Sequence, residues 1–279
     1  MKGKTVVITG GTSGIGEVAA ERLAAQGARI VLVARSPVRA DLTLKRLATV
    51  NTGVRHAVYY ADLSRLAEMR RVAAEVAASE PRIDVLINNA GAVFSRRQVT
   101  PDGLEMTFAT NHMAYFLLTT MLLERLKATP GARIVSTSSD AHKTGRLDFD
   151  DLQSQRSYVG FRVYGTSKLC NILFTRALTR RLAGTGVTAN CLHPGFVDTH
   201  FADNNQGMLG LAFGILKKIA AITPEAGAAT IVYLASSDEV AGKSGGYYYK
   251  CAPATPTAAA RSDADAERLW TASEEISNG

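Results

Sequence analysis

Two side chains with complementary chemistry stand four residues apart in the middle of the chain, Tyr164 and Lys168. The apolar residues that follow them recur at helical spacing, so both side chains are expected on one face of a helix. A phenol has an ordinary pKa of about 10 and is a poor acid or base at neutral pH, but a fixed ammonium beside it favours the phenolate. The pair could therefore exchange protons with a substrate. The alternative is an ordinary pair on the surface of a helix. The elements around the pair distinguish these two possibilities.

The first of these elements is a glycine-rich segment between a short β-branched run, residues 5–8, and a helical pattern that lasts to residue 26. In this context glycines permit a tight turn, and the helix N-terminus offers free N–H groups to a diphosphate. The spacing TGxxxGIG resembles the glycine motif of the short-chain dehydrogenase/reductase family. The residues expected at the cofactor are Gly10, Thr12, Ser13, Gly14, Ile15 and Gly16.

The second predicted strand, residues 29–34, is followed by Arg35, with Arg39 close by. A carboxylate at this point would bind the ribose diol and repel a 2′-phosphate, whereas a guanidinium suits the phosphate. The sequence therefore favours NADP(H) over NAD(H). A solvated arginine at a strand end is the alternative for Arg35. The resemblance points the same way, since family members that prefer NADP often carry a basic residue here.

Two later strand ends complete the nucleotide side of the predicted site. One carries Asp62 and Leu63, and the resemblance places this Asp-Leu pair beside the adenine. A turn at the start of the helix predicted over residues 66–78 is an equally good role for Asp62. The other strand leads into the family's NNAG motif, where small residues let a ribose approach the backbone and an Asn side chain can tie neighbouring strands. The motif residues expected at the cofactor are Asn89, Ala90 and Gly91.

The acid/base pair gains two partners from the centre of the chain. Ser138 and Ser139 follow a β-branched strand, and a hydroxyl at the carboxyl end of a parallel strand lies where open α/β sheets bind ligands. We expect Ser139 to hold the substrate oxygen, because the family's serine is normally the second of such a pair. The resemblance also implies that Asn111 anchors a water linked to Lys168. The predicted catalytic tetrad therefore consists of Asn111, Ser139, Tyr164 and Lys168.

A finer resemblance is to the retinol-dehydrogenase-like branch of the family. It rests on Ser138-Ser139-Asp140-Ala141-His142, on Asp151-Leu152-Gln153, on YGTSKLCNILFT from Tyr164 onward, and on Leu192-His193-Pro194-Gly195. The branch does not imply a particular substrate. Its members that act on retinoids often carry a membrane anchor, which is not expected in this sequence.

The C-terminal third is expected to form the substrate side. Pro-Gly sets a turn at the end of the sixth predicted strand, and the resemblance places the backbone after it at the nicotinamide; the residues implied are Pro194, Gly195, Val197 and Thr199. The apolar, glycine-containing stretch 200–222 is expected to be a lid that excludes water from hydride transfer. A buried helix pair, an oligomer contact or a peripheral membrane contact are its alternatives. In the extension 251–279 an amphipathic helix is expected to dock through Trp270, which could close one edge of the cleft.

Composition narrows the classes of protein that remain. The 279 residues, 46% hydrophobic and 20% charged, suffice for a substantial core. The net charge of +7 comes from scattered rather than clustered Lys and Arg, which argues against nucleic-acid binding. The cysteines lack metal-ligand spacing and suit a reducing cytosol, so we expect no metal and a cytoplasmic location. Neither a signal peptide nor a membrane-spanning segment is predicted.

We therefore predict one doubly wound Rossmann-like α/β domain over residues 1–279, a three-layer sandwich around a parallel sheet of about seven strands. The expected activity is NADP(H)-dependent hydride transfer to or from a carbonyl or alcohol of a small lipophilic substrate. Homo-oligomerisation is compatible with the sequence. The rival functions are a non-catalytic NADP(H)-binding sensor or scaffold, which would not need the tetrad, and a carbon–carbon double-bond reductase on the same fold.

Overall fold

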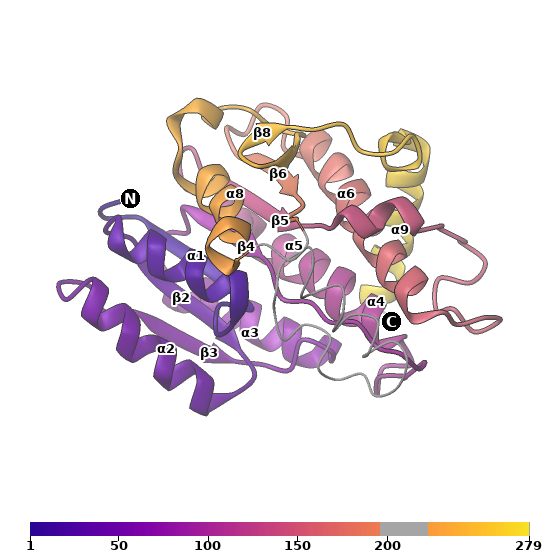
Figure 1. Ribbon diagram of the computed structural model, residues 1–279, viewed down its shortest axis with the longest axis horizontal. Coiled ribbons are helices and arrows are strands. Elements are labelled where there is room, and N and C mark those ends of the chain that lie inside the picture. Colours follow the sequence, from indigo (N-terminus) through magenta and orange to yellow (C-terminus); the bar gives the residue numbers. More distant parts are fainter. Residues whose placement is uncertain (196–222, 279) are drawn as a thin grey trace.

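The centre of the computed structural model, which describes residues 1–195 and 223–278, is a twisted eight-stranded sheet (Figure 1). Its strand order is β3-β2-β1-β4-β5-β6-β7-β8, and all neighbours pair in parallel except β7 and β8. The strands are β1 Thr5–Thr9, β2 Arg29–Ala34, β3 Ala57–Tyr60, β4 Val85–Asn88, β5 Arg133–Thr137, β6 Thr188–Leu192, β7 Tyr247–Tyr249 and β8 Ala252–Pro253. The doubly wound prediction is confirmed, with the two-residue antiparallel β8 added to the seven parallel strands.

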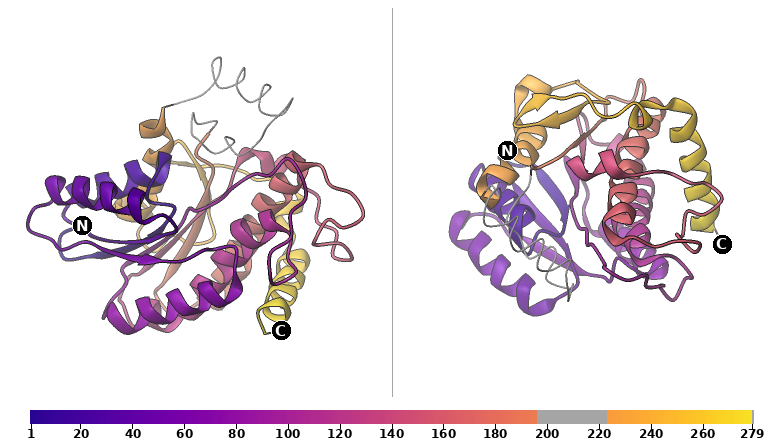
Figure 2. Two further views of the ribbon diagram at one scale, coloured as in Figure 1. Left: turned by 90° about the horizontal axis from the view of Figure 1, so that it is seen from below. Right: turned by 45° about the vertical axis from the view of Figure 1, so that its right-hand side comes forward.

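Helices cover both faces of the sheet, as the views in Figure 2 show. One face packs against α1 (Gly14–Ala25), α2 (Pro37–Val50) and α8 (Pro224–Ser236), and the other against α3 (Leu66–Ser79), α5 (Ala114–Lys127) and α6 (Gly160–Arg181). The buried apolar residues form one core cluster on each face. The strand order reverses between β1 and β4, which is where open α/β sheets bind ligands, at the carboxyl ends of the strands.

Apolar spacing over residues 104–127 predicts one long helix, but the structure interrupts it. A short α4 (Met106–Phe108) runs into a π-helical turn, Ala109–Met113, before α5 begins. Glu105 caps the start, its carboxylate accepting hydrogen bonds from the Phe108 N–H and the Thr107 hydroxyl. A π turn accommodates an extra residue and occurs frequently at functional sites. Apolar spacing does not reveal it, because the same face stays buried before and after the turn.

Residues 140–162, which follow Ser139, contain regular structure at both ends. This segment starts with a 3₁₀ helix, Asp140–Thr144, and its end already belongs to α6. Between them Gln153 anchors the loop: its side-chain oxygen accepts from the Glu105 N–H at 2.7 Å, and its carbonyl accepts from the Arg97 guanidinium at 3.0 Å.

The C-terminal helix α9 (Asp263–Asn278) lies along α6, on the side of the molecule away from the N-terminus (Figure 2, right). The Trp270 ring stacks on Phe174 and meets Phe116 edge-on, and the Arg181 guanidinium lies 4.0 Å from its centroid. The predicted docking through Trp270 is confirmed, but Trp270 does not line the cavity described below. In the described part of the chain no helix is long and apolar enough to cross a bilayer.

Candidate active site

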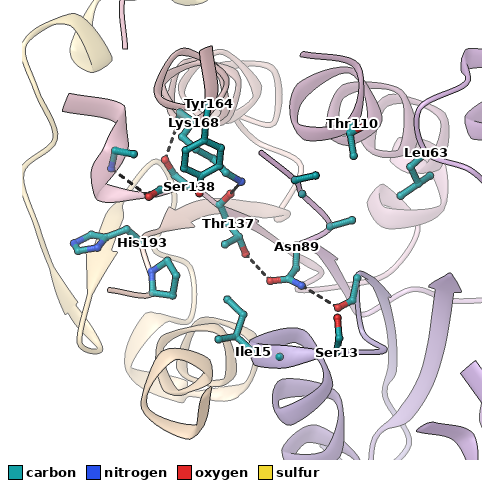
Figure 3. A pocket seen from close by; sticks show the side chains of 18 of the residues that line it. Ser13, Ile15, Leu63, Asn89, Thr110, Thr137, Ser138, Tyr164, Lys168 and His193 are labelled. Atoms are coloured by element: carbon teal, nitrogen blue, oxygen red, sulfur yellow. Dashed lines mark hydrogen bonds between the residues drawn. The ribbon is translucent and has the colours of Figure 1, made fainter. Parts of the chain in front are cut away.

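A cavity of about 1300 Å³ opens at the carboxyl ends of β1, β4, β5 and β6. It receives the residues that follow these strands, among them Gly10 after β1, Asn89 after β4, Ser138 after β5 and His193 after β6 (Figure 3). Its position at the reversal of strand order is the one that α/β sheets use for nucleotides. Segments far apart in the sequence therefore meet in one cavity.

The glycine turn after β1 brings α1 close to the strand ends. Gly10 has φ +66°, and a Cβ on it would lie 2.8 Å from the Ala90 Cα, while a Cβ on Gly16 would overlap the Gly10 carbonyl oxygen. Ser13 precedes α1 without a side-chain hydrogen bond to it, and Ser13, Gly14 and Ile15 line the cavity. The first turn of α1 thus keeps its N–H groups for an anion, so these residues fit a dinucleotide diphosphate.

Asn89 joins three strand ends beside this turn. Its side-chain amide donates to the carbonyl oxygens of Thr9 (3.3 Å) and Gly10 (3.2 Å), and its carbonyl accepts from the Thr137 hydroxyl at 3.3 Å (Figure 3). The Thr9 hydroxyl in turn accepts from the backbone N–H groups of Asn89 and Ala90. This is the tie between neighbouring strands expected of the Asn in this motif.

The far end of the cavity is lined by Arg35 and Arg39, and by Asp62 and Leu63. One oxygen of Asp62 accepts hydrogen bonds from the backbone N–H and the hydroxyl of Ser64. Asp62 therefore shapes the turn before α3 and lines the cavity as well, so the two roles left open for it do not exclude each other. The first N–H of α3 is capped from elsewhere, by Asp102 at 2.8 Å.

Tyr164 and Lys168 project from α6 into the same cavity (Figure 3). Lys168 is 2% exposed; its Nζ donates to the Thr137 carbonyl at 3.0 Å and lies 5.7 Å from the Tyr164 ring centroid. Burial lowers the pKa of Lys168 to about 7 and raises the pKa of Tyr164 to about 12, with the Ser139 hydrogen bond opposing the second shift. Burial is the largest cause of both shifts, so the phenol of Tyr164 is protonated at neutral pH in the absence of the cofactor.

The two serines after β5 have different surroundings. The Ser138 hydroxyl is buried and donates to the Lys168 carbonyl at 2.8 Å, which ties α6 to β5. The Ser139 hydroxyl accepts from the Ala141 N–H at 3.2 Å and hydrogen-bonds to Tyr164. This geometry supports the choice of Ser139 as the serine beside the reacting oxygen.

Asn111 lies in the π turn and is fully buried. Its amide donates to the Ala92 carbonyl and to the Ser167 hydroxyl, both at 2.9 Å, and its oxygen accepts from the Ala92 N–H at 2.8 Å. A Cβ on Gly91 would lie 3.2 Å from that oxygen and 3.4 Å from Lys168 Nζ. The structure therefore brings the four residues of the predicted tetrad into one neighbourhood.

Some cavity residues were not anticipated from the sequence. An apolar wall is formed by side chains from separate segments, namely Phe94, Met106, Phe161, Tyr247 and Tyr249. His193 stacks on Tyr249 with ring centroids 4.0 Å apart. No local pattern marks these residues, because only the folded chain brings them together. Pro194 and Gly195 line the cavity as expected, whereas Val197, Thr199 and the predicted lid 200–222 lie outside the described residues.

Comparison with known proteins agrees with this geometry. The family model for short chain dehydrogenase matches residues 4–210. Retinol dehydrogenase 14 of Homo sapiens is 41% identical over 289 residues, covering 98% of this chain and 86% of that protein. A crystal structure of an uncharacterised protein from Mycobacterium paratuberculosis has a TM-score of 0.79 at 31% identity, covering 99% and 94% of the two chains. A short chain dehydrogenase from Burkholderia cenocepacia J2315 in complex with NADP has a TM-score of 0.69 at 28% identity, covering 88% and 95%.

The family resemblance inferred from the sequence motifs is thereby confirmed along nearly the whole chain. The ordered motifs and the doubly wound sheet agree with the family model, and the similar retinol dehydrogenases indicate the branch of the family. This chain belongs to the short-chain dehydrogenase/reductase family, as a retinol-dehydrogenase-like oxidoreductase that acts on alcohols or carbonyls.

Proposed function

We propose that the protein catalyses reversible hydride transfer between NADP(H) and the carbonyl or alcohol carbon of a small lipophilic substrate, with Tyr164 as the general acid/base. One observation carries the proposal: Tyr164 is hydrogen-bonded to Ser139 and lies beside the buried Lys168, in the cavity that also receives the glycine turn. A perturbed acid/base pair in a nucleotide-sized cavity is the arrangement that such chemistry requires.

In the reductive direction the Tyr164 hydroxyl donates its proton to the substrate oxygen, which the Ser139 hydroxyl holds in place. The raised pKa of Tyr164, about 12, keeps the phenol protonated and ready for this step. NADP(H) would be held by the glycine turn and would supply or accept the hydride, and its oxidised form would contribute a positive charge to the site. In the oxidative direction a protonated Lys168 stabilises the phenolate. Asn111 sustains the proton relay that serves Lys168.

The preference for NADP(H) rests on the far end of the cavity. Arg35 and Arg39 line it, and neither forms an ion pair with an acid in the described part of the chain. Two guanidinium groups at this point favour a 2′-phosphate over a bare ribose diol. The NADP complex of the Burkholderia relative is in keeping with this assignment.

The lipophilic substrate is proposed from apolar side chains that line the same cavity as Tyr164. Phe94, Met106 and Phe161 contribute apolar side chains to the cavity, and the Phe161 and Tyr164 ring centroids lie 6.4 Å apart. We infer that Ser139 and Tyr164 bind the reacting oxygen, while these apolar side chains offer surface to a lipophilic substrate. The name of the Homo sapiens relative, a retinol dehydrogenase, points to the same class of alcohol.

The test is oxidation of NADPH and of NADH with a panel of aliphatic, aromatic, steroid and retinoid carbonyls. We expect turnover with NADPH in preference to NADH, and higher kcat/KM for the larger apolar carbonyls. A protein that binds NADPH tightly and turns over none of these carbonyls would instead support the sensor function. The cytoplasmic location and the homo-oligomer expected from the sequence stay predictions.

A further inference from the structure

His142 lies three residues after Ser139 in the 3₁₀ helix Asp140–Thr144 and is almost fully buried. Its Nδ1 lies 2.8 Å from the Ser139 carbonyl oxygen, and its Nε2 lies 3.3 Å from the backbone N–H of Thr257. A backbone N–H can only donate, so Nε2 accepts, and the neutral imidazole carries its proton on Nδ1. His142 therefore donates to Ser139 while accepting from Thr257.

Thr257 belongs to the segment 252–261, which begins with β8 and is held at both ends. The Ala254 N–H donates to the Tyr247 carbonyl at 2.8 Å, and Ala260 is buried in the same core cluster as α6. The Thr257 hydroxyl accepts from the Ala260 N–H. The match to the family model ends at residue 210, so this support for Ser139 comes from a part of the chain beyond it.

The 3₁₀ helix Asp140–Thr144 also packs against α6. A Cβ on Gly165 would lie 2.5 Å from both the Ala141 carbonyl oxygen and the Thr144 hydroxyl. Gly165 directly follows Tyr164, so the segment that carries Ser139 is packed closely against the helix that carries the phenol. Ser139 thus contacts α6 through Tyr164, and the segment 252–261 through His142.

We propose that His142 is a positioning residue through which the C-terminal segment 252–261 holds Ser139 at hydrogen-bonding distance from Tyr164. The proposal rests on the proposed function, in which Ser139 orients the substrate oxygen. His142 acts through the Ser139 backbone, because both of its ring nitrogens are used by the protein. The Ser139 carbonyl keeps a second donor, the His142 backbone N–H at 3.0 Å, so loss of the ring loosens this residue without freeing it.

The variants His142→Phe and His142→Asn separate ring volume from hydrogen bonding. Phe fills the space and donates nothing, so kcat should fall about tenfold, the worth of one hydrogen bond, with little change in the Kd for NADPH. Asn can place its amide near Nδ1 and should recover most of kcat. If His142→Phe does not fold, His142→Gln replaces it, since Gln reaches Thr257 but lacks the donor at the Nδ1 position.

The matched control is His56→Phe. His56 Nδ1 accepts from the Ile30 N–H at 3.0 Å. His56 lies just before the amino end of β3, whereas the cavity lies at the carboxyl ends of the strands. This variant should lower the melting temperature and leave kcat unchanged. A double-mutant cycle adds the decisive comparison: in a Ser139→Ala background, His142→Phe should cause no further loss of kcat.

A readout independent of turnover is the ¹³Cζ resonance of Tyr164 in tyrosine-labelled protein, assigned with Tyr164→Phe. It should move in His142→Phe and stay near its wild-type position in His142→Asn. A wild-type protein without turnover would overturn the proposed function, whereas an unmoved Tyr164 resonance in His142→Phe would overturn this inference. Equal kcat in His142→Phe and wild type, or an additive loss in the Ser139→Ala background, would overturn it as well.

Discussion

Replacing Lys168 by methionine should stabilise the cofactor-free protein while removing its activity. The Lys168 side chain is 2% exposed, and burial lowers its pKa from 10.5 to about 7. That shift means that the folded state disfavours the ammonium, relative to the neutral amine, by about 5 kcal/mol. Methionine fills a similar volume without a charge and should remove this penalty; replacing even paired buried charges by apolar residues is often neutral or stabilising, by about 1–4 kcal/mol. The Thr137 carbonyl keeps the Asn171 amide as a donor at 3.3 Å.

The pH dependence of the free energy of unfolding provides a second test of the burial of Lys168. Between pH 7 and 10.5 the unfolded chain holds the Lys168 proton and the folded chain has lost it, so stability rises with pH in this window. From pH 6.5 to pH 8.5 the gain is about 2 kcal/mol, and Lys168→Met should lack it. Burial also raises the pKa of the Cys170 and Cys191 thiols to about 12. Their opposing contribution at alkaline pH is common to both proteins and cancels in the difference.

The assay is urea unfolding of the cofactor-free wild type and of Lys168→Met at half-unit steps from pH 6.5 to 8.5. The two free energies of unfolding should converge as the pH rises, because the wild type gains stability and the variant does not. Two parallel curves, or a variant that is less stable at pH 6.5, would refute the assignment of Lys168 as a buried charge held at the expense of stability.

Three further predictions concern the cofactor, acid stability and the C-terminal helix. Arg35→Asp should weaken NADPH binding about 10- to 100-fold, the worth of charge-assisted hydrogen bonds, and shift the preference to NADH. An unchanged ratio of the Kd for NADPH to the Kd for NADH would show that Arg35 does not bind the 2′-phosphate. Burial lowers the pKa of His112 to about 3, so the free energy of unfolding should fall below pH 6.5, by about 2 kcal/mol at pH 5. In urea titrations His112→Phe should lack this part of the decrease. An equal dependence on pH in variant and wild type would contradict the prediction. Trp270→Ala should cost about 3–5 kcal/mol of unfolding free energy, yet leave the Kd for NADPH unchanged, because Trp270 lies outside the cavity; a weaker Kd would place it in the site.

Local pattern was enough to predict the frame of this protein. Strands β1, β4 and β5 are rich in β-branched residues and are followed by glycine, asparagine and serine, respectively, and the chain order of these signals allows few topologies. The glycine turn and the Tyr164–Lys168 spacing were predictable because each depends on residues close together in sequence. The structure then supplied the reason why Asn89 suits its position, which is to join the ends of β1, β4 and β5.

Contacts between distant segments could not be predicted in this way. Asp102 caps α3 from 36 residues away, and Thr257 reaches His142 across 115 residues. The π turn at Asn111 is likewise determined by bonds to Ala92 and Ser167 rather than by helical spacing. Burial at the site was also not predictable from spacing: the sequence indicated a charge beside the phenol, and the structure adds that burial lowers the pKa of Lys168 and raises the pKa of Tyr164.

The central claim is that Tyr164 transfers the proton that accompanies hydride transfer, and Tyr164→Phe tests it most directly. The measurement is kcat with NADPH and the best carbonyl of the panel, together with the Kd for NADPH from fluorescence titration. We predict an unchanged Kd and a kcat lower by about a thousandfold, within the range for loss of a general acid. Turnover within a few-fold of wild type, or a loss of activity fully explained by weaker NADPH binding, would contradict the assignment.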